Sequence, residues 1–150
     1  MKLVIGCDHA AFEAKTEIVT YLKSNGHTII DEGTQGLDSV DYPDFAASVS
    51  RSVLSGSADR GILICGTGIG MSIAANRFKG IRAALCFNEE LAELSRLHND
   101  ANVLCLGART QSIESMKNIL SIWLTTAWEG ERHAIRLAKI ESNSRGQDAE

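Results

Sequence analysis

The chain lacks any block of basic residues. Its 15 lysines and arginines are outnumbered by 19 aspartates and glutamates, which gives a formal charge of -4. Nucleic-acid-binding domains usually carry clustered positive charge, so the composition argues against that function and favours a small-molecule partner. Long apolar runs are also missing: Asp8 and His9 interrupt the stretch after Lys2 too early for a secretory leader. We therefore expect neither a nucleic-acid nor a membrane partner.

Cysteine patterns typical of metal sites are absent as well. The four cysteines, Cys7, Cys65, Cys86 and Cys105, show no C-x-x-C spacing and have no paired histidines nearby. Reduced thiols in the cytoplasm fit this pattern best. We expect Cys7, Cys86 and Cys105 to be small buried hydrophobic residues. Cys65 has no resolving cysteine near it in the sequence, which disfavours a redox function.

The chain does contain a regular alternation of strand-like and helix-like segments. Its 150 residues, 44% of them hydrophobic, can bury roughly 70% of the unfolded surface, so we expect one domain over 1–150. Strands are predicted at 2–7, 28–31, 60–65, 83–87 and 103–106, and helices at 11–24, 41–56, 71–78, 89–97, 112–123 and about 132–141, before a frayed tail at 143–150. This order predicts an α/β fold with a parallel sheet covered by helices on both faces.

Polar residues follow three of these strands. Asp8 and His9 come after the first, Cys65 ends the third, and Arg109 follows the fifth. Parallel α/β sheets bind ligands beyond the carboxyl ends of their strands. If the first and third strands are neighbours, with the second outside them, Asp8, His9 and Cys65 face one crevice.

The most informative stretch is Gly61 to Gly70, where a thiol at the end of a buried strand is followed by a glycine-rich loop. Glycines let the backbone approach a ligand closely, and the amides and dipole of the following helix attract negative charge and favour a thiolate. The register lacks the third glycine of a dinucleotide site, the lysine of a P-loop and the arginine of a cysteine phosphatase, because Met71 or Thr67 stands in those places. A tight turn without a ligand remains the alternative.

Two further groups of residues are candidates for the site. His98, with Asn99 beside it, can act as acid or base on a sugar ring oxygen, although a histidine at this position can also simply cap a helix. Arg132 and Arg136 stand four apart, which puts both on one helix face and suits a phosphate; a solvated charged face explains them equally well. His133 is expected at the surface or an interface, and Trp123 and Trp128 are expected to pack.

Together these groups suit proton transfer next to the carbonyl of a phosphorylated sugar, and this chemistry needs no metal. A base removes the proton on the carbon beside the carbonyl, amides stabilise the enediolate, and arginines hold the remote phosphate. Isomerisation between an aldose and a ketose is the reaction that follows.

Several stretches resemble the type B ribose-5-phosphate isomerases: G-C-D-H near the start, D-Y-P at 41–43, I-C-G-T-G-I-G-M-S-I-A-A-N-R-F from Ile64, R-L-H-N-D at 96–100 and G-E-R-H at 130–133. The resemblance runs from Lys2 to about Ile140. It implies a cofactor-free enzyme of the pentose phosphate pathway that interconverts ribose 5-phosphate and ribulose 5-phosphate. It also implies a three-layer Rossmann-like fold with strand order 2-1-3-5-4, and a homodimer, sometimes paired into a tetramer, with active sites at the subunit boundary.

The resemblance also implies roles for individual residues. Cys65 is the proton-abstracting base and His98 opens the furanose ring. The remaining site residues fall into four groups: the enediolate loop (Gly66, Thr67, Gly68, Ile69, Gly70), sugar contacts (Asp8, His9, Asn99), phosphate contacts (Arg109, Arg132, Arg136, with His9) and a wall residue (Tyr42). One departure is visible, because the D-H-x-G turn of the family has Ala11 in place of glycine, which could shift the helix start.

Two other functions stay open. A relative acting on six-carbon sugar phosphates, such as allose or galactose 6-phosphate, would keep the same loop, since pocket size cannot be deduced from the sequence. A noncatalytic sugar-phosphate-binding protein would keep the anion-binding loop but transfer no proton.

Overall fold

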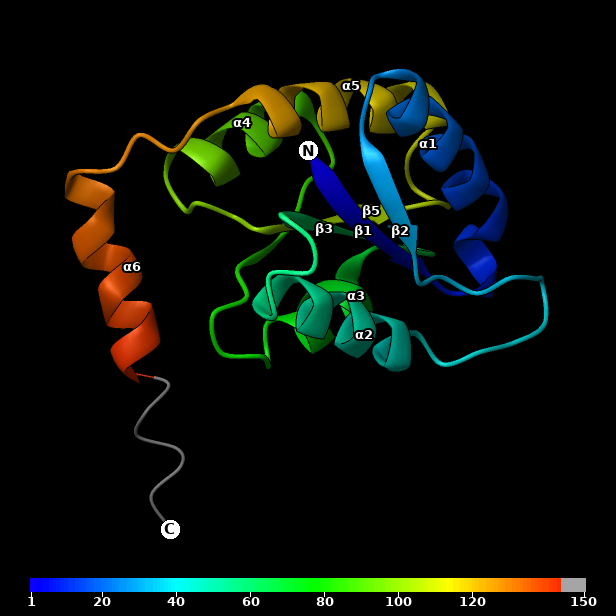
Figure 1. Cartoon of the computed structure of the whole chain (residues 1–150), viewed down its shortest axis with the longest axis horizontal. Helices are drawn as coiled ribbons and strands as arrows, with labels where there is room; N and C mark the ends of the chain where they lie inside the picture. Colours follow the sequence, from blue (N-terminus) through cyan, green and yellow to red (C-terminus); the bar gives the residue numbers. More distant parts are fainter. Residues whose placement is uncertain (144–150) are drawn as a thin grey trace, which may run out of the picture.

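The structure, a computed structural model, describes residues 1–143 and is built on a five-stranded parallel sheet. The strands are β1 (Lys2–Cys7), β2 (Thr28–Asp31), β3 (Arg60–Cys65), β4 (Ala83–Leu85) and β5 (Val103–Gly107), in the order β2-β1-β3-β5-β4. The helices are the 3-10 turn η1 (His9–Ala11), α1 (Phe12–Ser24), α2 (Tyr42–Leu54), α3 (Ile69–Ala75), α4 (Glu89–Leu97), α5 (Ile113–Thr125) and α6 (Arg132–Asn143). Figure 1 shows α1, α4 and α5 on one face of the sheet and α2 and α3 on the other. The predicted three-layer fold and strand order are confirmed.

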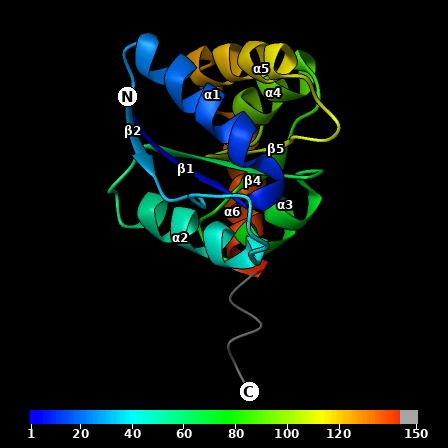
Figure 2. The same ribbon diagram turned by 90° about the vertical axis from the view of Figure 1, so that its right-hand side faces the viewer.

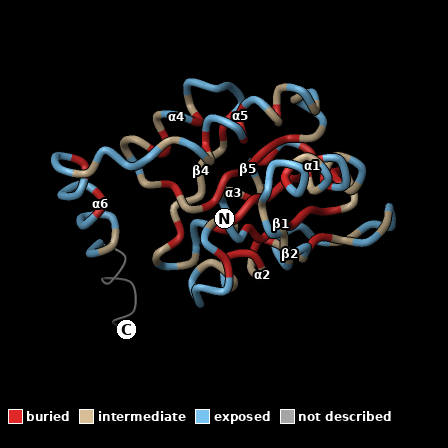
Figure 3. Tube along the Cα trace, turned by 45° about the horizontal axis from the view of Figure 1, so that its top comes forward, coloured by how far each residue is buried: buried red, intermediate tan, exposed pale blue. Residues whose placement is uncertain are grey.

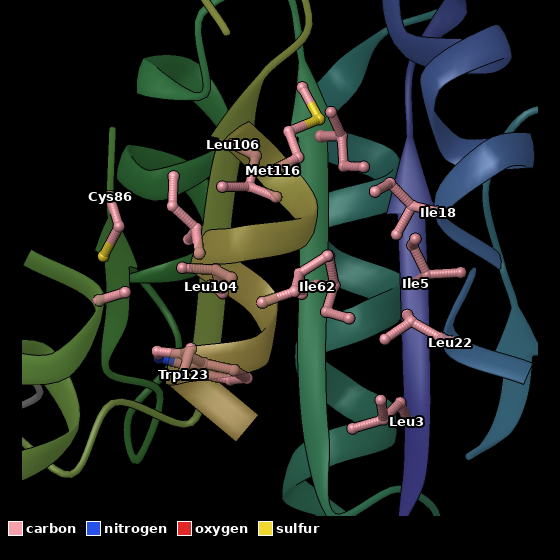
Figure 4. Packing of buried hydrophobic residues seen from close by; sticks show 14 of the residues in the cluster. Leu3, Ile5, Ile18, Leu22, Ile62, Cys86, Leu104, Leu106, Met116 and Trp123 are labelled. Atoms are coloured by element: carbon pink, nitrogen blue, oxygen red, sulfur yellow. The ribbon is translucent and has the colours of Figure 1, made fainter. Parts of the chain in front are cut away.

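The uninterrupted apolar run of β3 exists because helices cover both of its faces. Ile62 and Ile64 belong to the apolar cluster under α1 and α5, whereas Leu63 belongs to the cluster on the α2 and α3 side. All three side chains are fully buried. Figure 4 shows the first cluster, in which Trp123 closes one end. The part of this central parallel strand that is covered on both faces, from Gly61 to Cys65, is thus free of charged side chains, and only Arg60 at its start is partly exposed.

Several of the predicted helix and strand boundaries were wrong. Helix α1 begins at Phe12, because the Asp8 side chain accepts a hydrogen bond from the amide of Ala10 and starts a 3-10 turn first. Helix α3 begins at Ile69, two residues earlier than predicted, and ends at Ala75. Strand β4 stops at Leu85, and the side chain of Phe87, predicted to lie in this strand, is exposed.

Helix α6 stands apart from the three layers at the left of Figure 1. In Figure 2, turned by 90°, it lies behind the sheet and the α2 and α3 layer. His133 and Leu137 are buried, but Ile135 and Ile140 are exposed by 66% and 54%. Figure 3 shows the exposed majority of this helix. The predicted tail at 143–150 loses Asn143 to α6 and otherwise lies outside the described residues. Within residues 1–143, no helix has the length and hydropathy needed to cross a bilayer.

Two strand glycines allow α2 to approach the sheet closely. A Cβ atom added to Gly61 would lie 2.7 Å from Cγ1 of Val49 and 3.2 Å from Cγ2 of Val103. One added to Gly6 would lie 2.8 Å from Cγ2 of Val49. Because these neighbours are core side chains and not flexible surface groups, a methyl group at either position must displace α2.

We expect Gly61→Ala to lower the free energy of unfolding by about 1–3 kcal/mol, since overpacking a closed core forces side chains and backbone apart. Urea unfolding followed by circular dichroism measures this loss. Gly36→Ala is the matched control, because a Cβ at Gly36 meets no atom within 4 Å. Equal stability of the two variants would contradict the packing argument.

Candidate active site

A cavity of about 450 Å³ opens at the carboxyl ends of β1, β3 and β5. Its lining combines groups from both sides of the central strand: Asp8, Tyr42, Cys65, Gly66, Thr67, Ile69, Gly70, Ile73 and Arg109. Strands β1 and β3 are neighbours with β2 outside them, as predicted. The lining adds Ile73 to the residues expected from the sequence, and it contains neither His9 nor Gly68.

Cys65 ends β3 and places its sulfur against the glycine loop. Its Sγ accepts a hydrogen bond from the amide of Gly68 over 3.2 Å, and the side chain is 5% exposed. An amide directed at sulfur stabilises negative charge on it, as does the positive end of the following helix dipole. The geometry therefore suits a thiol that loses and regains a proton.

The glycines of this loop are also needed for its shape. Gly68 has φ of 78°, and a Cβ there would lie 2.6 Å from Cδ1 of Leu85 and 2.9 Å from the carbonyl oxygen of Leu106. A Cβ on Gly70 would lie 2.6 Å from Cζ of Tyr42. The glycines thus make the turn tight and also shape the cavity wall. The absence of a side chain at Gly70 allows Tyr42 to approach the loop and line the cavity.

Asp8 and His9 occupy the turn after β1. Asp8 is 7% exposed, its Oδ1 accepts a hydrogen bond from the amide of Ala10 at 3.0 Å, and the residue lines the cavity. His9 accepts a hydrogen bond from the amide of Val40 at Nδ1, over 3.2 Å. In the neutral imidazole this bond puts the proton on Nε2, so His9 offers a donor.

Arg109 follows β5 and lies over the glycine loop. A Cβ on Gly66 would be 3.2 Å from one terminal guanidinium nitrogen, and the amide of Arg109 donates to the carbonyl of Gly66 over 2.9 Å. Within residues 1–143, the ion pairs of the structure do not include Arg109. Its charge is therefore available to an anionic ligand in the cavity.

The other three cysteines are free thiols buried in the interior, as predicted from the sequence. Cys7, Cys86 and Cys105 are each at most 1% exposed. Burial raises the pKa of Cys7 to about 11 and also raises the pKa of Cys86 and of Cys105. Desolvation penalises the thiolate, so these cysteines stay protonated at neutral pH.

The remaining predicted residues lie elsewhere in the chain. His98 caps the end of α4, and Asn99 lines a second cavity of about 400 Å³ together with Leu137 and Ile140 of α6. Arg132 and Arg136 are exposed on α6. None of these four residues lines the Cys65 cavity. One chain thus carries the predicted site as two separate groups, which we call the Cys65 group and the His98 group.

His133, expected at the surface or an interface, does not lie at the surface of the chain. It is 5% exposed, and its ring stacks on His98 with centroids 4.4 Å apart and planes 19° from parallel. Its Nε2 lies 3.3 Å from a carboxylate oxygen of Glu129 and accepts from Nε of Arg132 at 3.2 Å. The i, i+4 spacing from Glu129 to His133 and on to Leu137 was the available signal. The expectation for Trp128 was wrong, because it is 39% exposed, whereas Trp123 is buried.

His98, Glu129 and His133 also form the group in the described chain that comes nearest to a metal site. Their ligand atoms all lie within 4.8 Å of one another. The two imidazole rings are stacked, however, so their lone pairs lie in nearly parallel planes and do not converge on one point. A metal would have to rotate one ring and displace Arg132, so the side chains as placed do not form a ligand set.

Comparison with known proteins identifies the family of the chain. The profile of the family described as Ribose/Galactose Isomerase matches residues 3–140. The chain belongs to this family. Ribose-5-phosphate isomerase B of Escherichia coli is 48% identical over 139 residues, 93% of each chain. Galactose-6-phosphate isomerase subunit LacB of Clostridium acetobutylicum is 38% identical, covering 98% of this chain and 87% of its own.

A solved family member has nearly the same structure. The Clostridium thermocellum ribose-5-phosphate isomerase B superposes with a TM-score of 0.97 at 49% identity, covering 98% of this chain and 99% of its own. The matched region of the chain therefore includes both groups, from the strand that carries Cys65 to the helix that carries Arg132.

Proposed function

We propose that the chain interconverts D-ribose 5-phosphate and D-ribulose 5-phosphate, an aldose–ketose isomerisation of the pentose phosphate pathway, in the cytoplasm. One observation carries the proposal: Cys65 Sγ meets the amide of Gly68 at 3.2 Å on the wall of a cavity that also contains Asp8 and Arg109. The names of the relatives support the same reaction, and four free thiols fit a reducing compartment.

The proposed chemistry begins on the open-chain aldose. Cys65, as a thiolate, takes the proton from the second carbon, and the negative charge moves to the oxygen on the first carbon. Loop amides stabilise this cis-enediolate, because they are fixed before the charge appears. The hydroxyl proton on the second oxygen passes to the first, and Cys65 returns its proton to the first carbon, which gives the ketose.

The His98 group is proposed to complete this site from a second copy of the chain. His98 gives a proton to the ring oxygen and removes one from the anomeric hydroxyl, so the furanose opens before Cys65 acts. Asn99 and Asp8 hold hydroxyl groups, and Arg132 and Arg136 join Arg109 and His9 at the phosphate. A homodimer is supported by the exposed Ile135 and Ile140 of α6 and by the separation of the two groups in one chain.

A six-carbon sugar phosphate is the second candidate substrate, because the galactose-6-phosphate isomerase subunit is 38% identical over nearly the whole chain. We expect kcat/KM for ribose 5-phosphate to exceed that for allose 6-phosphate and galactose 6-phosphate by at least about tenfold, since one extra carbon must fit the same span between thiol and arginine. Steady-state kinetics with all three sugars measures the ratio. A higher kcat/KM for a six-carbon sugar phosphate than for ribose 5-phosphate would contradict the proposed five-carbon substrate.

Cys65→Ala should abolish exchange of the proton on the second carbon of ribose 5-phosphate with solvent deuterium, a loss of about 10²–10⁴-fold. Substrate binding and the circular dichroism spectrum should persist. NMR in deuterated buffer measures the exchange, and Cys86→Ala is the control with a buried thiol outside the site. Undiminished exchange in Cys65→Ala would exclude the thiol as base, and a wild-type chain that binds the sugar without exchange would be a binding protein.

Mixing two inactive variants tests whether the site is shared. Cys65→Ala and His98→Gln should each be inactive alone, whereas refolding them together as a 1:1 mixture should restore about a quarter of wild-type activity, because half of the dimers then carry one intact site of two. Each variant refolded with itself is the control. No recovery after mixing, with dimers confirmed by light scattering, would place both groups in one chain's site.

A further inference from the structure

Three charged residues outside the proposed catalytic set hold the turn that carries His98 and Asn99. The carboxylate of Asp100 accepts hydrogen bonds from two arginines: Arg96 at 2.8 Å through Oδ1 and Arg82 at 3.1 Å through Oδ2. Arg82 Nε also donates to the backbone carbonyls of Asn99 at 3.0 Å and Asp100 at 3.1 Å. Both the side chain and the backbone of the turn are therefore fixed by guanidinium groups.

The backbone at Asp100 requires such support. Its φ of 44° is left-handed, a conformation that residues other than glycine adopt uncommonly. Aspartate tolerates it better than most residues, and here its carboxylate bridges two cations at the same time. This conformation reverses the chain directly after Asn99, so it sets the direction in which His98 and Asn99 project from the end of α4.

Arg96 anchors the bridge in the interior. It is 5% exposed and donates to the carbonyls of Ala101 at 2.6 Å and Thr126 at 3.4 Å, while its guanidinium lies 5.9 Å from the Trp123 ring. Burial, and then the charge of Arg96, lowers the pKa of the neighbouring Arg60 to about 10, and Asp100 acts in the opposite direction. The carboxylate thus offsets a concentration of buried positive charge.

Arg82 extends the network to α6. One of its terminal nitrogens lies 3.6 Å from a carboxylate oxygen of Glu141, and its side chain is 22% exposed. The same guanidinium therefore touches the turn after His98 and the helix that carries Arg132 and Arg136. The stacking of His133 on His98 is a second link between α4 and α6.

We propose that Asp100, Arg82 and Arg96 are positioning residues that fix His98 and Asn99 relative to α6, so that the His98 group meets the sugar as one rigid unit. The inference rests on the proposed isomerase function, because it assumes that His98 opens the sugar ring. It assigns to these residues an effect on ring opening that a purely structural role would not have.

The test separates ring opening from proton transfer. Ribulose 5-phosphate has no furanose ring, so exchange of its first-carbon protons with solvent deuterium needs Cys65 but not the ring-opening step. We expect Asp100→Asn to lower kcat for ribose 5-phosphate by about 10- to 100-fold, as small displacements of catalytic groups do. Exchange into saturating ribulose 5-phosphate should stay within about twofold of wild type.

Arg82→Gln should likewise lower kcat for ribose 5-phosphate while leaving exchange into ribulose 5-phosphate nearly unchanged. It serves as a second variant if Asp100→Asn folds poorly, because Arg96 still pairs with Asp100 in it. Glu93→Gln, an acid-to-amide change at an exposed position of α4, is the matched control. Equal losses in both assays, or no loss in either variant, would overturn the proposal.

An NMR measurement distinguishes failure of the positioning role from failure of the proposed function. The His98 ring resonances of the wild type, Asp100→Asn and Arg82→Gln report the stacking on His133 without any substrate. Changed His98 resonances in the variants support the positioning role even if the wild type proves to have no isomerase activity, and unchanged resonances in both Asp100→Asn and Arg82→Gln contradict it.

Discussion

The parallel pairing of β3 with β1 on one side and β5 on the other is the constraint on which the Cys65 cavity depends. The register sets Cys7 opposite Ile64 and Cys65 opposite Gly107, so the turns after all three strands leave the sheet at similar height. Beyond the strands, the amide of Ala108 donates to the carbonyl of Cys65 at 2.8 Å. Backbone hydrogen bonds, more than side-chain contacts, therefore determine how close Arg109 comes to the thiol.

Much of this arrangement could be predicted because its causes are local. The apolar run at 62–64 predicts a strand covered on both faces, and the glycines after Cys65 predict a tight corner, since only glycine fits Gly68 at its φ of 78°. Strictly alternating elements then leave few topologies. The predictions were wrong where a neighbour distant in sequence decides the outcome, as at α3, whose start depends on the fit of Gly68 against Leu85 and Leu106.

The His98 group could be named from the sequence but not located. The position of its arginines, Arg132 and Arg136, relative to His98 depends on the path of residues 126–131 and on the direction of α6, and neither is set by a local pattern. The burial of His133 follows from contact with His98, some 35 positions away, and Trp128 is exposed because α6 does not fold back over it. When a site is divided between two separate regions, the sequence alone reveals it only through motifs that resemble those of other proteins.

The contrast among the four cysteines has a practical consequence. Three sulfurs are buried in the interior and one borders a cavity open to small molecules. An alkylating reagent such as iodoacetamide therefore meets a single accessible sulfur in the folded chain. Counting the label taken up per chain therefore measures the fraction of chains with an intact Cys65 cavity, and a stoichiometry above one reports unfolded material.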